Sequence, residues 1–192
     1  ADFDVARHTL RDATEGRRAR ALWHTAQAMT DLLQGDVVLA QQESDTAVQL
    51  LPGEPHAVLV QAQVAVRRGE RPRAERLLAN IERSVSVGAR ASVLRVELLL
   101  DGGRAHEALA SAEGLDRAHP TVTVVKNLLG LARAAVGDRV GAREAFEAAL
   151  RLDPHAGDPL VNMARLQRES GDRSGAKATL ERAMGVAPDH AG

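Results

Sequence analysis

Small and apolar residues recur along the chain at helical spacing, and glycine interrupts the pattern at regular intervals. The stretch VGDRVGAREAFEAALRLDP, Val136 to Pro154, shows the unit once. A glycine and an acidic residue come first, Ala142, Phe146 and Ala149 follow at spacings of one helical turn, and a proline closes the segment. Because residues three or four apart share a face of an α-helix, this stretch predicts a turn, an amphipathic helix and a stop.

The same marks return every 34 residues, which indicates an internal repeat. Stepping by this period from Ala142 always reaches an alanine: Ala40, Ala74, Ala108, Ala142 and Ala176. Five positions before each alanine lies a glycine: Gly35, Gly69, Gly103, Gly137 and Gly171. The position twelve residues after each alanine holds proline in every copy but one: Pro52, Ser86, Pro120, Pro154 and Pro188. Chance does not produce such a register without insertions.

Elementary backbone chemistry explains each of these marks. Glycine ends a helix readily because a left-handed C-terminal conformation costs it little. The residue after the glycine is acidic in most copies, and the helix dipole favours negative charge at the start of the next helix. The repeated alanine suits a close crossing of two helices, and proline cannot continue a helix. Each copy is therefore predicted to be a helix, a tight turn and a second helix.

This pattern resembles the tetratricopeptide repeat, a helix–turn–helix unit with the same period. The residues that carry the resemblance are Leu129, Gly130, Gly137, Asp138, Ala142, Phe146, Ala149 and Pro154, and in the last copy Met163, Ala164, Gly171, Asp172, Ala176, Leu180, Ala183 and Pro188. The resemblance implies an all-α fold, a right-handed superhelical solenoid in which first helices line a concave groove. It covers essentially the whole chain.

The register divides the chain into five repeats and a remnant. The repeats are expected at 21–54, 55–88, 89–122, 123–156 and 157–190. Residues 1–20 are expected to hold the second helix of a truncated repeat and a junction, so the chain opens within a repeat and is interpreted as a segment of a longer array. The third repeat is atypical, with Ala112 at the large apolar position and SVSVG, Ser84 to Gly88, before it, so we expect an irregular stack or a bend there. Trp23 is expected to pack against the remnant helix.

Composition narrows the classes of function. The formal net charge of −1 lacks the basic excess of a nucleic-acid binder, and the chain has no cysteine for a disulfide or thiolate metal site. No apolar run reaches the ~18 residues of a membrane span, so membrane insertion is not expected. The seven histidines include no pair three or four residues apart, and no phosphate-cradling glycine loop or nucleophile elbow occurs. We therefore expect no metal, no cofactor and no catalysis within these residues.

The resemblance places the candidate site in the groove, at the second, fifth, ninth and twelfth positions of each repeat. Most of these positions hold apolar residues, and the last repeat supplies charged ones. We expect an apolar floor with a polar end near Asn127, Asn162, Arg165 and Arg168. The candidate partner-binding residues are Met29, Leu32, Leu59, Gln63, Val66, Val93, Glu97, Leu100, Asn127, Leu131, Asn162, Arg165 and Arg168. Some of the apolar members could equally be ordinary core between helices.

The function that follows is a non-catalytic scaffold that binds a protein or peptide in the concave groove. Lysines are absent from the groove positions, so the grip on C-terminal carboxylates known in some members of the family is not expected. Two alternatives stay open: a periplasmic segment of an exopolysaccharide-export or cell-envelope assembly protein, and a regulatory arm of a larger enzyme. Self-association through the ends of the array is a further possibility, and the sequence does not indicate the compartment.

Overall fold

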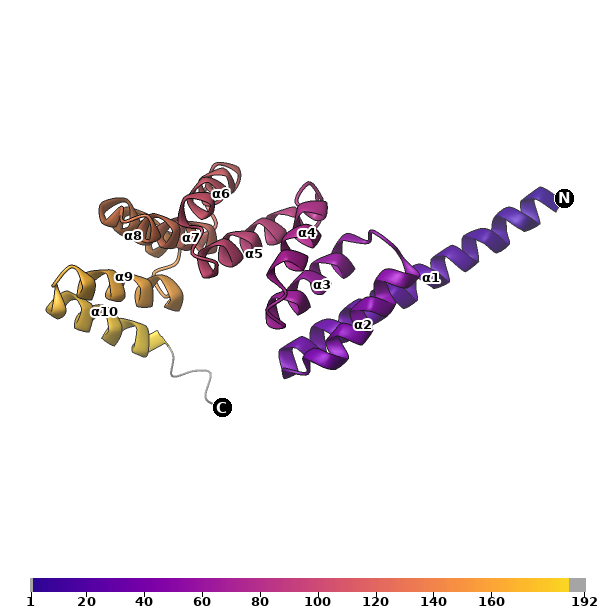
Figure 1. Ribbon diagram of the computed structural model, residues 1–192, viewed down its shortest axis with the longest axis horizontal. Coiled ribbons are helices and arrows are strands. Elements are labelled where there is room, and N and C mark those ends of the chain that lie inside the picture. The colour runs from indigo at the N-terminus through magenta and orange to yellow at the C-terminus, as the bar shows by residue number, and fades with distance from the viewer. Residues whose placement is uncertain (1, 187–192) are drawn as a thin grey trace. The chain divides into compact units, whose positions relative to one another are not determined.

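The computed structural model describes the backbone of residues 2–186 and the side chains of residues 14–185. Within this part of the chain all regular secondary structure is helical (Figure 1), as the sequence predicts. The helices are α1 (Asp2–Gln34), α2 (Val37–Leu50), α3 (Pro55–Arg67), α4 (Arg71–Ile81), α5 (Gly88–Asp101), α6 (Ala105–Ala118), α7 (Thr123–Ala135), α8 (Arg139–Leu152), α9 (Gly157–Glu169) and α10 (Arg173–Val186). The second helix of every pair begins 34 residues after the previous one, which reproduces the register of the sequence.

The tight turns within the helix pairs confirm the predicted role of the repeated glycines. Gly35, Gly69, Gly103, Gly137 and Gly171 all have φ between 71° and 87°, a left-handed conformation that other residues adopt only with strain. The acidic residue that follows caps the second helix in three pairs. Asp138 accepts a hydrogen bond from the backbone nitrogen of Gly141 at 2.9 Å, and Asp36 and Asp172 make the corresponding bonds.

The first helix differs from the prediction. α1 runs without a break through residues 14–20, where the sequence suggested a junction (Figure 1). The reason is local: α1 contains no proline, and alanine and arginine around Gly16 favour a helix strongly enough to carry it across one glycine. The expected packing of Trp23 against a separate remnant helix is wrong, because Trp23 lies on the same continuous helix α1. Its side chain is 60% exposed, with an edge-on contact to the ring of His24. The sequence also places Phe3 and Leu10 at the apolar positions of the remnant's second helix, and this prediction lies outside the described side chains.

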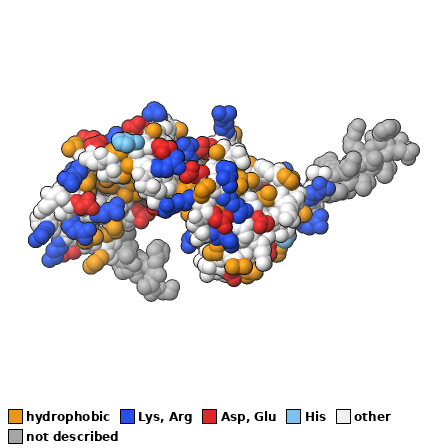
Figure 2. Space-filling view, in the orientation of Figure 1, with side chains coloured by type: hydrophobic (Ala, Val, Ile, Leu, Met, Phe, Trp, Pro, Cys, Tyr) orange, Lys and Arg blue, Asp and Glu red, His pale blue; other side chains and the backbone are white. Residues whose placement is uncertain are grey.

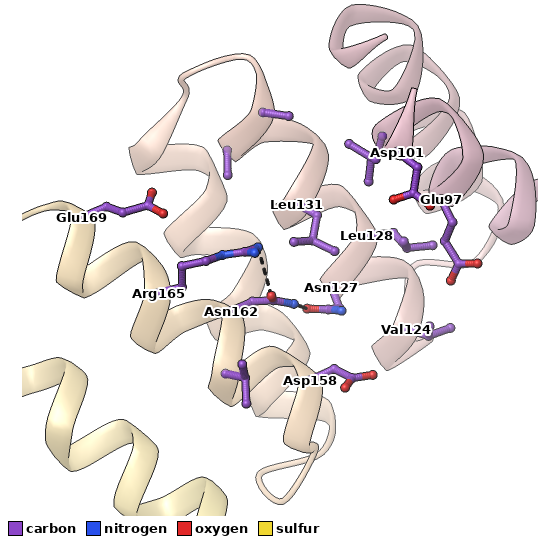
Figure 3. A pocket seen from close by; sticks show the side chains of 14 residues that line it. Glu97, Asp101, Val124, Asn127, Leu128, Leu131, Asp158, Asn162, Arg165 and Glu169 are labelled. Carbon is purple, nitrogen blue, oxygen red and sulfur yellow. Dashed lines mark hydrogen bonds between the residues drawn. The ribbon is translucent and has the colours of Figure 1, made fainter. Parts of the chain in front are cut away.

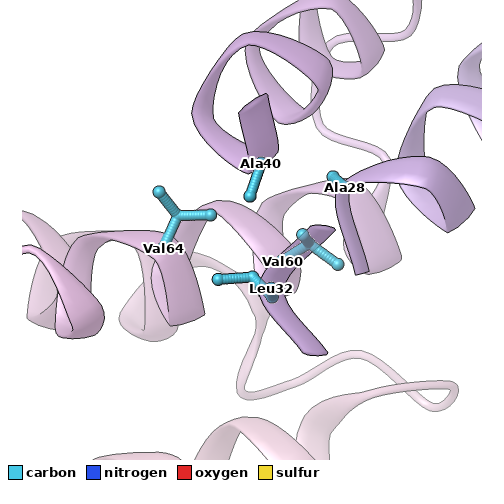
Figure 4. Close-up of a cluster of buried hydrophobic side chains, with 5 residues drawn as sticks. All are labelled: Ala28, Leu32, Ala40, Val60 and Val64. Atoms are coloured by element: carbon cyan, nitrogen blue, oxygen red, sulfur yellow. The ribbon is translucent and has the colours of Figure 1, made fainter. Parts of the chain in front are cut away.

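The helices form two units, Ala1–Leu94 and Arg95–Gly192, and the boundary falls within α5. In the first unit, α1, α2 and α3 pack together around Ala28, Leu32, Ala40, Val60 and Val64 (Figure 4). The methyl group of Ala40 is fully buried between the helices, and the corresponding alanines of the other four pairs are buried too. A larger side chain at this position would have to displace a helix, which explains why alanine recurs there.

The junction before α5 is irregular, as expected from the loss of proline at Ser86. α4 ends at Ile81 and has 11 residues, whereas the other second helices have 14. Turns occupy residues 82–83 and 85–87, and the backbone nitrogen of Gly88 donates to the carbonyl oxygen of Ser84 at 2.8 Å. A Cβ atom on Gly88 would collide with the backbone of Glu82. Glycine therefore permits the close approach that starts α5.

The core of the second unit depends on matched side-chain sizes. Phe146 of α8 is buried against Ala142 and against Met163 and Leu166 of α9. Its ring lies so close to Gly130 of α7 that a Cβ atom there would be 2.6 Å from Phe146 Cδ1. The same two register positions in the third repeat hold Val96 and Ala112, both buried. The large and small partners are thus exchanged, which gives a physical account of the atypical third repeat.

Candidate binding groove

The second unit contains a groove of about 670 Å³ between the exposed faces of α5, α7 and α9 (Figure 3). We call it the α5–α7–α9 groove. Its lining residues repeat along each helix at spacings of three and four, so each helix contributes one face. From α5 these are Glu97, Leu100 and Asp101; from α7, Val124, Asn127, Leu128, Leu131, Ala134 and Ala135; and from α9, Asp158, Val161, Asn162, Arg165 and Glu169.

One wall of the groove is apolar and rigidly supported. Leu128 is buried, and Leu131 is half-buried against the core cluster that contains Phe146. Val124 and Val161, by contrast, are 44% and 50% exposed to solvent. Burial of apolar surface stabilises a complex by roughly 25 cal/mol per Å². A partner that covers these two valines would therefore gain binding free energy.

Polar side chains connect α7 to α9 along the floor of the groove. Asn162 Nδ2 donates to Asn127 Oδ1 at 2.9 Å, and Arg165 Nη2 donates to Asn162 Oδ1 at 3.1 Å (Figure 3). Asn127 is only 6% exposed, yet no hydrogen bond of its own amide nitrogen occurs among the described residues. This nitrogen is not among the fully buried side-chain atoms that lack a partner, so it reaches the groove surface and is available to donate to water or to a ligand.

The groove carries an excess of negative charge. Glu97, Asp101, Asp158 and Glu169 line it, and Arg165 is its one basic residue. Glu97 is exposed as a residue, but the pKa of its carboxyl group is raised, first because neighbouring groups partly desolvate it and then because Asp101 and Asp158 repel it. On the face of the molecule seen in Figure 2, acidic and basic side chains are intermingled. The excess in the groove is therefore a local feature, since the net charge of the chain is close to zero.

Six of the thirteen candidate residues from the sequence line this groove. They are Glu97, Leu100, Asn127, Leu131, Asn162 and Arg165. Arg168 is exposed on α9 but does not line it. Asn127, Asn162 and Arg165, which were expected at a polar end, are joined by hydrogen bonds, but this ladder lies along the groove floor, and carboxylates outnumber the arginine.

The candidates in the first unit are placed differently. Leu32 and Leu59 are 7% and 2% exposed, so they pack as core between helices and offer no groove surface. Met29 packs partly buried against the cluster of Figure 4. Gln63, Val66 and Val93 are half-buried, and the buried Oε1 atom of Gln63 has no hydrogen-bond partner among the described residues. The apolar floor expected here is in large part the interior of the unit.

The candidate set missed the acidic residues Asp101, Asp158 and Glu169. Asp158 occupies the second position of its repeat, which the family pattern already includes. Asp101 and Glu169 occupy the thirteenth position, one helical turn beyond the ninth and therefore on the same face. Extending the positional pattern by one turn would have found both.

Two other kinds of feature are not found in the described residues. Within residues 14–185, no three histidine, aspartate or glutamate side chains are placed to hold a metal ion together. None of the helices in the described part of the chain has the length and apolar character required to cross a membrane.

Comparison with known families gives matches along most of the chain. Two sequence profiles described as Tetratricopeptide repeat match residues 59–122 and 133–191. The TPR repeat-containing protein PA4299 of Pseudomonas aeruginosa is 36% identical over 85 residues, which is 44% of this chain. The match spans only 35% of that relative, about a third of its length.

Solved structures of low sequence identity show the same fold. TTC0263, a thermophilic TPR protein of Thermus thermophilus, is 18% identical with a TM-score of 0.79, over 88% of this chain and 93% of that one. Pseudomonas aeruginosa pilF is 21% identical with a TM-score of 0.77, over 90% and 78%. YrrB, described as a TPR protein with an unusual peptide-binding site, is 19% identical with a TM-score of 0.62, over 94% and 93%. These similarities establish the fold class, a solenoid of paired helices.

Proposed function

Because the chain belongs to the tetratricopeptide repeat family, whose helix pairs serve as protein-interaction scaffolds, we propose that it binds a segment of another protein in the α5–α7–α9 groove. The observation that carries the proposal is the composition of this groove. It combines the exposed valines Val124 and Val161 with the amide nitrogen of Asn127, which has no acceptor among the described residues. An apolar surface and a hydrogen-bond donor side by side suit a peptide, which presents side chains and backbone carbonyls together.

A peptide partner also fits the rigidity of the site. The leucine wall rests on the Phe146 core, and the hydrogen bond between Asn162 and Asn127 holds α9 against α7. A preformed groove avoids part of the ordering cost of association. YrrB, which has the same fold, is described as having a peptide-binding site, and this supports the proposal by analogy of fold.

The test is capture of partners on the immobilised chain from extracts of its own cells, with matched valine variants. Val124→Asn with Val161→Asn alters the groove, and Val38→Asn with Val140→Asn makes the same change at exposed helical valines outside it. All four valines are exposed, so both variants should fold, which circular dichroism checks. A partner that is lost from the groove variant and retained by the control supports the proposal. A partner retained equally by both variants contradicts it.

A further inference from the structure

We propose that the α5–α7–α9 groove selects a cationic segment, in which a lysine or arginine side chain lies among Glu97, Asp101 and Asp158 while an apolar neighbour covers the valine and leucine wall. This inference rests on the proposed function and names the chemistry of its partner. The groove is unlike a neutral peptide groove because four carboxylates line it against one guanidinium.

Three of the four groove carboxylates receive no cation from within the described protein. Glu97, Asp158 and Glu169 make no ion pair among residues 14–185. Arg165 directs its Nη2 atom to Asn162 (Figure 3), and Lys126, which lies next to Asn127 on α7, is bound to Asp116 at 2.7 Å. Lys126 is thus paired outside the groove, whereas Arg165 keeps its charge within it and offsets one of the four carboxylates. The groove retains an excess of negative charge.

Placing these carboxylates together has a cost in the unbound protein. Partial desolvation of Glu97, and then repulsion from Asp101 and Asp158, raise the pKa of its carboxyl group. A guanidinium or ammonium group entering between them would offset both penalties at once. No three acidic side chains in the described part of the chain are arranged around a metal position, so a cation on a flexible side chain fits better than a bare metal ion.

A second observation points to a peptide as the carrier of this cation. The amide nitrogen of Asn127 lies on the groove floor without an acceptor among the described residues and can donate to a backbone carbonyl. Val124 and Val161 also line the groove and can receive an apolar side chain. Acid, amide and apolar surface therefore occur within one groove and match a basic, partly apolar segment.

The experiment measures binding of three labelled peptides of equal length by fluorescence anisotropy. The peptides repeat Leu-Lys-Ser, Leu-Gln-Ser or Leu-Glu-Ser. The full chain should bind the lysine peptide at least about tenfold more tightly than the glutamine peptide, with affinity falling as salt increases. The glutamate peptide should bind least.

Variants locate the effect in the groove. Glu97→Gln with Asp158→Asn should weaken binding of the lysine peptide about tenfold. Glu144→Gln with Glu147→Gln removes the same charge from the exposed surface of α8 and should leave the affinity unchanged. Glu97→Lys should shift the preference toward the glutamate peptide. Equal weakening by both double variants would mean that net charge alone attracts the peptide, and would overturn the inference.

Failure of this inference is distinct from failure of the proposed function. If the glutamine peptide binds as tightly as the lysine peptide, and Val124→Asn with Val161→Asn abolishes both, the groove binds peptides without selecting cations. If the lysine peptide does not bind at all, the cationic preference is refuted, and the capture experiment with the valine variants decides separately whether the groove has a partner.

Discussion

Gly130→Ala tests the packing of the second unit because two opposing effects meet at this residue. In an exposed helix, glycine to alanine stabilises by about 1 kcal/mol. At Gly130, however, the new Cβ would lie 2.6 Å from Phe146 Cδ1, well inside van der Waals contact. The ring cannot withdraw easily, because Ala142, Met163 and Leu166 surround it. Overpacking of this kind costs about 1–3 kcal/mol, so the net effect should be destabilisation by up to about 2 kcal/mol.

Gly114→Ala is the matched control. Gly114 also lies within a helix, α6. A Cβ atom added there would meet only the guanidinium of Arg117, with the Nη2 atom 3.9 Å away. This variant should therefore gain about 1 kcal/mol. Since a change of about 1 kcal/mol shifts Tm by about 2–4 °C in a chain of this size, circular dichroism melts should separate the two variants by several degrees. A Gly130→Ala protein that melts at or above Gly114→Ala would refute the close contact with Phe146.

Three further substitutions test other parts of the account. Ala142→Leu should overpack the crossing of α7, α8 and α9 and destabilise the protein by about 1–3 kcal/mol in urea unfolding, and unchanged stability would refute the register. Asp138→Ala removes the cap bonded to Gly141 and should cost about 1 kcal/mol by the same assay, more than Asp153→Ala, which caps no helix start. Glu97→Gln should raise Tm at neutral pH, because a raised pKa means that the folded state disfavours the ionised carboxylate. The difference should narrow as pH falls through the raised pKa and vanish below about 4, where folded and unfolded chains are both protonated; a Tm difference independent of pH would contradict it.

The helix pairs could be predicted because their marks depend on local chemistry. A left-handed turn requires glycine, as at Gly137, and a close helix crossing requires a small residue, as at Ala142. Both requirements recur with the repeat and are visible in any one copy. The continuity of α1 was harder to predict. Gly16 weakens a helix without ending it, and the lack of a proline nearby is a weaker signal than a proline would be.

The groove was predictable only in part, because burial depends on what packs above each position. Leu32 and Leu131 both lie on first helices at positions of the groove pattern, yet Leu32 is core and Leu131 lines the groove. Sequence position alone does not distinguish them. The acidic character of the groove arises from residues of α5 and α9 that lie far apart in the sequence, such as Glu97 and Asp158. Their proximity becomes evident only when the helices are folded together.

The most direct test of the central claim is photo-crosslinking at a single residue in the cells that make the protein. A benzophenone amino acid replaces Val161 in the groove or, as the control, Val140, which is 71% exposed on α8 and outside the groove. The account predicts a discrete protein adduct from position 161 and none from position 140. An adduct at position 140 with none at position 161 would contradict it, because the binding surface would then lie on α8 and the α5–α7–α9 groove would not be the site of interaction.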